Sequence, residues 1–231
     1  MIGFENVRKE YPGGTLAVED FTLEIASHEA VALVGTSGSG KTTLMRMINR
    51  MVDPTSGRVT IDGEDVAGMN PVALRRSIGY VMQASGLLPH RTVLDNITTV
   101  PVLRGTAKGE ARERARELMD TVGLDPELAS RYPAQLSGGQ QQRVGVARGL
   151  AADPNILLMD EPFGAVDPIV REELQSELQR LQRELRKTIV FVTHDIDEAF
   201  RIGDRVVILR PGGRIAQVGT PQEILADPAD D

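Results

Sequence analysis

The sequence contains no cysteine and no tryptophan, and its aromatic residues make up only 3% of the chain. Without cysteine there is no disulfide and no cysteine-ligated metal site, which fits a reducing cytosol. With so few aromatic residues, an aromatic cage for a cationic ligand is not expected within this chain. No apolar run approaches the ~20 residues of a membrane span, and no signal-peptide pattern opens the chain. We therefore expect neither a membrane-spanning segment nor a secretory signal.

A basic patch is also missing. The net charge is −7 over 231 residues, so nothing in the charge pattern supports a nucleic-acid partner. The chain is 41% hydrophobic and 26% charged, which is ordinary for a globular protein of one large domain or a domain with a subdomain.

What the chain does contain is a glycine-rich loop at Gly35–Thr42 that fits G-x-x-x-x-G-K-[ST]. An apolar run at 31–34 precedes it and a helical pattern at 44–48 follows, the context that a phosphate-binding loop requires. Glycines let backbone N–H groups approach phosphate oxygens, and the helix start adds a positive dipole end. A Gly/Ser surface loop is the plain alternative. The predicted binding residues are Gly35, Thr36, Ser37, Gly38, Ser39, Gly40, Lys41, Thr42 and Thr43, with Lys41 on the β- and γ-phosphates and the Thr42 hydroxyl suited to Mg²⁺.

The rest of the chain predicts an α/β fold with one domain over residues 1–231. Residues 1–30 have the pattern of strands around a turn at 12–14, with Tyr11 just before it. Continuous apolar runs at 78–82, 155–160 and 188–193 are typical of buried parallel strands. Residues 84–154 show helical patterns only. We therefore expect a P-loop core with a mixed sheet (1–83 and 155–231), an antiparallel N-terminal part, and an inserted α-helical subdomain at 84–154.

Polar side chains follow three of these apolar strands. In an open parallel sheet, ligands bind at the carboxyl ends of the strands. Asp160 is suited to holding Mg²⁺ directly or through water, and Glu161 to orienting an attacking water as a general base. Gln83 can reach the metal or the water, and His194 the γ-phosphate. Alone, two adjacent acids after a strand would indicate only a strand end, and a lone histidine is usually structural. The proposed roles therefore depend on the glycine-rich loop at Gly35–Thr42.

A second cluster of small residues, Leu136–Gln140 (LSGGQ), opens another predicted helix. The Ser137 hydroxyl and the N–H groups of Gly138 and Gly139 are anion donors at a helix start. The glycine-rich loop at Gly35–Thr42 already provides one phosphate site. The second donor cluster therefore suggests that two chains share each nucleotide, one supplying the glycine-rich loop and the other Ser137–Gly139. A simple Ser N-cap is the alternative.

These motifs together resemble the nucleotide-binding subunit of an ATP-binding cassette (ABC) transporter, from Met1 to about Pro228. The resemblance implies ATP and Mg²⁺ as ligands and head-to-tail dimers that close on ATP. It assigns adenine stacking to Tyr11, the Q-loop to Gln83, the D-loop to Gly164–Asp167 and the switch histidine to His194. The commoner D-loop has Leu where this chain has Val166. The implied catalytic residues are Glu161, His194 and Gln83; the metal ligands are Thr42, Gln83 and Asp160; the ATP-binding residues are Tyr11, 35–43, Ser137, Gly138, Gly139 and Gln140.

A narrower resemblance is to importers of compatible solutes such as glycine betaine, carnitine and choline. Segments at 41–50, 78–90, 131–146, 159–165 and 191–195 carry it. It implies transmembrane permease subunits, an extracytoplasmic substrate-binding protein as an indirect partner, and a place at the cytoplasmic face of the cell membrane. Many such cassettes continue into a regulatory CBS region, and this chain ends about where that region would begin. Cargoes such as amino acids, polyamines or anions remain open. A soluble cassette ATPase of translation or DNA repair and an exporter are disfavoured.

Overall fold

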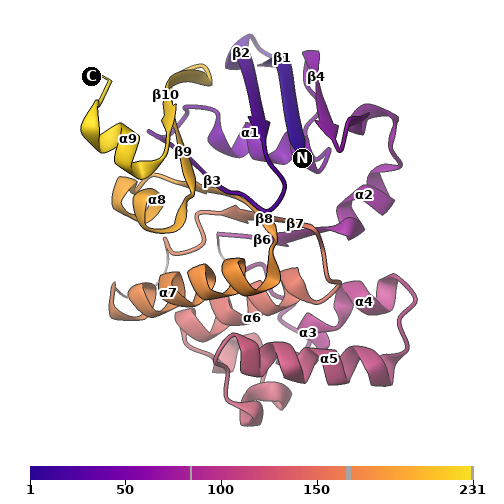
Figure 1. Ribbon diagram of the computed structural model, residues 1–231. Helices are drawn as coiled ribbons and strands as arrows, with labels where there is room; N and C mark the ends of the chain where they lie inside the picture. Colours follow the sequence, from indigo (N-terminus) through magenta and orange to yellow (C-terminus); the bar gives the residue numbers. More distant parts are fainter. Residues whose placement is uncertain (84, 165–167, 230–231) are drawn as a thin grey trace. The chain divides into compact units, whose positions relative to one another are not determined.

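The computed structural model describes residues 1–83, 85–164 and 168–229, and it divides into two compact units (Figure 1). The first unit comprises Met1–Arg75 and Gln182–Asp231, and the second comprises Arg76–Leu181. The expected helical insertion at 84–154 lies within the second unit. Among the described residues, no helix has the length and hydropathy needed to cross a bilayer.

The first unit begins with an antiparallel sheet in the order β2-β1-β4-β5. Its strands are β1 (Ile2–Tyr11), β2 (Thr15–Ile25), β4 (Ser56–Ile61) and β5 (Glu64–Asp65). Gly13 and Gly14 have positive φ angles of 101° and 82°, which close the turn between β1 and β2. Phe4 packs edge-to-face on Phe21 with ring centroids 5.1 Å apart. The antiparallel N-terminal part is therefore confirmed, with an aromatic pair in its core.

Four further strands of the first unit follow the order β10-β9-β3-β8. They are β3 (Ala30–Gly35), β8 (Thr188–Thr193), β9 (Arg205–Arg210) and β10 (Arg214–Gly219). Strand β3 runs parallel to both β8 and β9, whereas β9 and β10 form an antiparallel pair. All six residues of β8 are buried, which is the burial that its continuous apolar sequence predicts.

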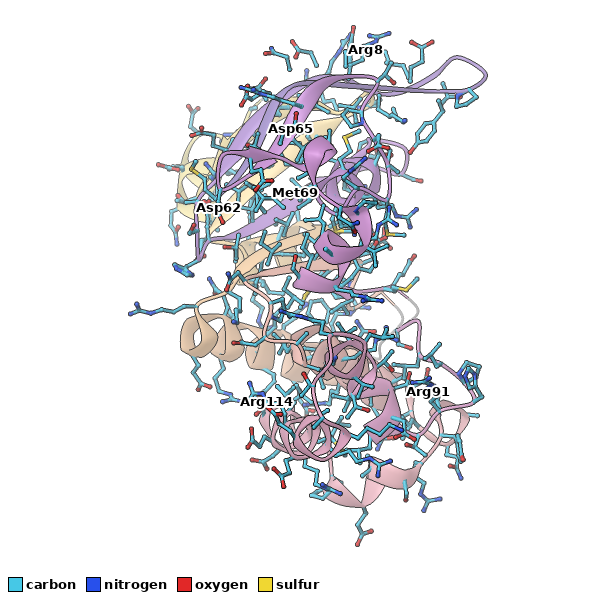
Figure 2. The ribbon with its side chains drawn as sticks, turned by 90° about the vertical axis from the view of Figure 1, so that its right-hand side faces the viewer. Arg8, Asp62, Asp65, Met69, Arg91 and Arg114 are labelled. Carbon is cyan, nitrogen blue, oxygen red and sulfur yellow. The ribbon has the colours of Figure 1, made fainter. Side chains whose placement is uncertain are left out.

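Short helices complete the first unit. They are α1 (Lys41–Ile48), the 3₁₀ turn η1 (Val66–Gly68), α8 (Ile196–Ile202) and α9 (Pro221–Ala226). Figure 2 shows Asp62, Asp65 and Met69 on this part of the chain. Arg50 donates to the carbonyl of Met69 at 2.7 Å, which ties the end of α1 to the segment after η1. The chain passes from the first unit to the second within α2 (Pro71–Ser77) and returns to the first within α7 (Pro168–Leu185).

The second unit holds one parallel strand pair and most of the helices (Figure 1). Strand β6 (Ile78–Val81) pairs with β7 (Ile156–Asp160), and α6 packs against β6. The helices are α3 (Val93–Ile97), α4 (Thr99–Leu103), α5 (Lys108–Thr121), α6 (Gly138–Leu150) and α7 (Pro168–Leu185), with 3₁₀ turns η2 (Pro126–Ser130) and η3 (Pro133–Gln135). Of the expected D-loop, residues 165–167 lie outside the described residues.

A buried asparagine organises the start of this helical part. The Asn96 side chain is fully buried, and its amide donates to the carbonyls of Leu88, Arg91 and Thr92 at 2.9–3.1 Å. Its Oδ1 accepts from the Leu88 N–H at 2.7 Å. Because both ends of the amide are satisfied, the loop before α3 is held without regular secondary structure.

Candidate functional site

The glycine-rich loop connects the end of β3 to the start of α1, as the sequence predicts. Gly38 and Gly40 have φ angles of 82° and 87°, in the region that side chains rarely enter. A Cβ on Gly40 would lie 2.5 Å from the carbonyl oxygen of Ala17, and one on Gly35 would lie 2.5 Å from that of Leu209. Conformation and close packing therefore both require glycine at Gly40.

The lysine of this loop is folded back onto the loop itself. Lys41 is 6% exposed, and its Nζ donates to the carbonyls of Gly35 and Thr36 at 2.6 and 2.8 Å. The N-cap of α1 is Gly40, which has no side chain to cap the first turn. The helix start thus offers N–H groups without a side-chain cap, next to a buried cation. Both features favour an anion at this point.

Tyr11 reaches the same helix from β1. Its hydroxyl lies 3.3 Å from Oγ1 of Thr43, in the first turn of α1. The ammonium of Lys9 lies 5.1 Å from the centroid of the Tyr11 ring and donates to the carbonyl of Asp53 at 2.7 Å. The Tyr11 side chain is therefore held by Thr43 at its hydroxyl and by Lys9 on one face of its ring. We did not predict either contact from the sequence.

His194 is exposed and directly follows β8. Because β3 and β8 are parallel, with Val34 opposite Thr193, the glycine-rich loop and His194 leave the sheet at the same end. The first unit thus brings Tyr11, the loop at 35–43 and His194 to neighbouring positions. Asp195 caps the next helix by accepting from the N–H groups of Asp197 and Glu198.

The second unit brings together Gln83, Asp160 and Glu161. Nε2 of Gln83 donates to Oε2 of Glu161 at 2.8 Å. Asp160 ends β7 and is 8% exposed, and the Tyr80 hydroxyl of the paired strand donates to its Oδ2 at 3.3 Å. Glu161 has a φ angle of 44°, uncommon for a residue with a side chain. The backbone turn after β7 therefore directs two adjacent carboxylates toward different partners.

The LSGGQ segment forms a helix N-terminus, as predicted. Ser137 is the N-cap of α6, its Oγ accepting from the Gln140 N–H at 3.2 Å while the Gln140 side chain accepts from the Ser137 N–H at 2.9 Å. This is a capping box, so the plain N-cap interpretation of Ser137 holds. The hydroxyl proton of Ser137 is not used in this bond, and the anion-donor role stays a prediction.

Sequence reasoning missed Lys9 and Tyr80, which contact Tyr11 and Asp160, and Arg148, which donates to the carbonyls of Ser85 and Gly86 near Gln83. Strand alternation could have shown that Lys9 shares a face with Tyr11, since the two are two residues apart on β1. For Arg148, the available signal was an arginine inside a run of small and apolar residues near the end of α6.

Comparisons with known proteins agree with this geometry. The ABC transporter family model matches residues 18–164. The choline transport ATP-binding protein OpuBA of Bacillus subtilis is 54% identical over 231 residues, 100% of this chain and 60% of that protein. The glycine betaine uptake system ATP-binding protein YehX of Escherichia coli is 49% identical over 231 residues, 100% of this chain and 74% of that protein.

A solved dimeric structure of the ATP-binding cassette MJ0796, in a post-hydrolysis state with ADP and Pi, superposes with a TM-score of 0.86 at 37% identity. The match covers 96% of this chain and 99% of that one. The fold is therefore that of an ATP-binding cassette. The chain belongs to the ABC transporter family. It spans 60% of the length of the Bacillus subtilis relative.

Proposed function

We propose that this chain is the ATP-hydrolysing subunit of an importer for a compatible solute of the glycine betaine, carnitine or choline type. The observation that carries the reaction is the glycine-rich loop with its buried lysine ahead of an uncapped helix start. The likeness to the choline and glycine betaine proteins over the whole chain supports the cargo class.

ATP binding is assigned to the first unit. A bound triphosphate competes with the carbonyls of Gly35 and Thr36 for the Lys41 ammonium, which then pairs with phosphate oxygens. The N–H groups of the loop and of the α1 start supply further donors. The ring of Tyr11 stacks on the adenine through the face opposite Lys9.

The available donors fit Mg²⁺. Thr42, Asp160 and Gln83 offer hydroxyl, carboxylate and amide oxygens, the hard ligands that this ion prefers. The Gln83 amide nitrogen is bonded to Glu161, which leaves Oε1 as its acceptor. In the part of the chain that the structure describes, no three acidic or histidine side chains form a metal cage. Mg²⁺ needs none, because it keeps waters and substrate phosphates as ligands. When bound, it neutralises charge on the phosphates.

Hydrolysis is assigned to Glu161 as the general base. Water attacks the γ-phosphorus, its proton passes to the Glu161 carboxylate, and the bond to the bridging oxygen of ADP breaks. Gln83 holds that carboxylate through its amide at 2.8 Å. His194, at the end of the strand beside the glycine-rich loop, hydrogen-bonds the γ-phosphate.

The proposed active form is a head-to-tail dimer in which Ser137, Gly138 and Gly139 of one copy reach the γ-phosphate held by the other. The dimeric MJ0796 cassette, 37% identical, supports dimerisation. Closure of the dimer drives permease subunits that receive solute from an extracytoplasmic binding protein, which places the cassette at the cytoplasmic face of the membrane.

The test combines turnover with assembly. In Glu161→Gln, the loss of the general base lowers kcat for Mg-dependent ATP hydrolysis by about 10²–10⁴-fold, the usual size of this contribution. The same variant forms dimers with ATP in analytical ultracentrifugation. Ser137→Arg, which places bulk and charge at the α6 start, does not dimerise. Unchanged turnover in Glu161→Gln contradicts Glu161 as the general base, and ATP-bound monomers only contradict the shared-site mechanism.

Cargo is tested separately by uptake of labelled betaine and choline in a strain that lacks this chain. We expect the wild-type gene to restore uptake and the Glu161→Gln gene to fail. Restored uptake of an amino acid or polyamine, without betaine or choline, would reassign the cargo and leave the ATPase assignment intact.

A further inference from the structure

Arg148 is a half-buried cation near the end of α6 that has no carboxylate partner among the described residues. Its Nη1 donates to the carbonyl of Gly86 and its Nη2 to the carbonyl of Ser85, both at 2.7 Å. Desolvation lowers the pKa of the Arg148 guanidinium. Burying a charged group is unfavourable unless the group is hydrogen-bonded. The bonds to these two carbonyls therefore stabilise the half-buried Arg148 guanidinium.

The two carbonyls belong to a strained turn. Ser85 and Gly86 both have φ angles of 54°, and Ser85 is 4% exposed. The Ser85 N–H donates to the carbonyl of Met82 at 3.0 Å. A left-handed conformation is unfavourable for a residue with a side chain, so it persists only where the surroundings enforce it. Arg148 binds both carbonyls, and the Ser85 hydroxyl also donates to Oε1 of Gln141 at 3.5 Å.

Gln83 directly follows Met82, whose carbonyl accepts from the Ser85 N–H. The Gln83 amide is committed to one atom, Oε2 of Glu161, at 2.8 Å. Glu161 itself lies on a left-handed backbone with a φ angle of 44°. A shift of Ser85 that breaks its hydrogen bond to Met82 therefore also moves the adjacent Gln83 amide relative to Glu161.

We propose that Arg148 is a positioning residue for Gln83: by binding the Ser85 and Gly86 carbonyls it fixes Ser85, whose N–H donates to the carbonyl of Met82, and so keeps the neighbouring Gln83 amide on Glu161. The inference rests on the proposed ATPase function, since it assigns Arg148 a part in orienting the general base. Arg148 acts through Gln83 and does not contact ATP.

The first experiment compares Arg148→Met and Arg148→Lys with a matched control on the same helix. Arg143 also donates to a backbone carbonyl at 2.7 Å, but that carbonyl belongs to Val122 and not to Ser85 or Gly86. Hydrogen bonds to charged groups contribute about 1.5–3 kcal/mol, so Arg148→Met lowers kcat by about 10- to 100-fold. KM for ATP keeps its wild-type value. Arg148→Lys, which retains a charged donor, recovers part of kcat, and Arg143→Met leaves kcat unchanged.

A double-mutant cycle with Gln83→Ala tests the route of the effect. If Arg148 acts through Gln83, Arg148→Met lowers kcat much less in the Gln83→Ala background than in the wild type. Full additivity, or wild-type kcat in a folded Arg148→Met protein, overturns the proposal. Should Arg148→Met fail to fold, Arg148→Lys carries the same cycle.

A third measurement does not depend on turnover. Hydrogen–deuterium exchange of the Ser85 amide, which is bonded to Met82, accelerates in Arg148→Met and not in Arg143→Met. Unaltered exchange in Arg148→Met contradicts the proposal. A wild-type chain without ATPase activity contradicts the proposed function instead, while the exchange result still decides whether Arg148 holds the turn.

Discussion

The glycine-rich loop of the first unit and the carboxylate cluster of the second use their backbones in opposite ways. In the loop, glycines take the left-handed conformations, and the space beside Gly35 and Gly40 is closed to any side chain. In the second unit, Ser85 and Glu161 take such left-handed conformations although they carry side chains. The glycine-rich loop thus takes its conformation because glycines have no side chain. In the second unit, Tyr80 donates to Asp160, Gln83 donates to Glu161, and Arg148 donates to the carbonyl of Gly86.

This difference predicts how each region fails. Substitutions in the loop act on ATP affinity or on folding, because the loop is a packed backbone element. Substitutions in the cluster act on turnover, because its side chains orient one another.

The largest effect expected in the loop comes from Lys41→Met. It removes the charge that pairs with the phosphates, at about 1.5–3 kcal/mol for each bond to a charged group, so ATP affinity falls by about 100-fold. Isothermal titration calorimetry measures this change. Lys108→Met is the control, because Lys108 is exposed and has no recorded hydrogen bond or ion pair within the described residues. An equal loss in both variants would mean that overall charge, and not the loop, governs binding.

A smaller effect, on thermal stability, is expected from replacing Gly40 or Gly63 by alanine, and comparing the two separates the cost of the backbone conformation from the cost of a steric clash. Gly40 and Gly63 have similar φ angles of 87° and 83°, but a Cβ on Gly63 would meet nothing within 4 Å. Gly63→Ala therefore carries only the conformational cost of about 1–2 kcal/mol, a fall in Tm of about 2–8 °C for a chain of this size. Gly40→Ala adds the clash with Ala17 and lowers Tm further. Calorimetry that finds equal shifts would show that the packing around Gly40 yields easily.

The smallest effect is expected from Tyr11→Phe. The variant loses the hydroxyl contact to Thr43 but keeps the ring and its Lys9 neighbour. A neutral hydrogen bond contributes about 1 kcal/mol, so KM for ATP rises by about fivefold and kcat is unchanged. Tyr11→Leu, which removes the ring, should raise KM more. If Tyr11→Phe and Tyr11→Leu behave alike, the ring does not stack on the base.

The comparison also explains what the sequence could predict. Gly40 and Lys41 could be predicted from the pattern G-x-x-x-x-G-K-[ST], because the backbone of a phosphate-binding loop requires these residue types at a fixed spacing. Ser137 is found as a helix start for the same reason, since its capping box spans only four residues. The antiparallel strands around the turn at 12–14 follow from local alternation and turn residues.

Two of the missed side chains, Tyr80 and Arg148, contact residues distant in the sequence. Tyr80 meets Asp160 across a strand pair, and Arg148 meets Ser85 over 63 positions. Periodicity indicates which faces are buried but not which carbonyl a buried arginine reaches. The helix α4 was not predicted, because Pro101 within its five residues favours a break and its β-branched residues weaken a helical pattern. The assigned roles of Gln83, Glu161 and His194 stay predictions until turnover is measured.

The most direct test of the account is a crystal structure of the Glu161→Gln protein with ATP and Mg²⁺. We predict a dimer in which Ser137 Oγ of one copy hydrogen-bonds the γ-phosphate that Lys41 of the other copy holds. A structure with ATP on Lys41 and no Ser137, from either copy, within hydrogen-bond distance of the γ-phosphate would contradict it.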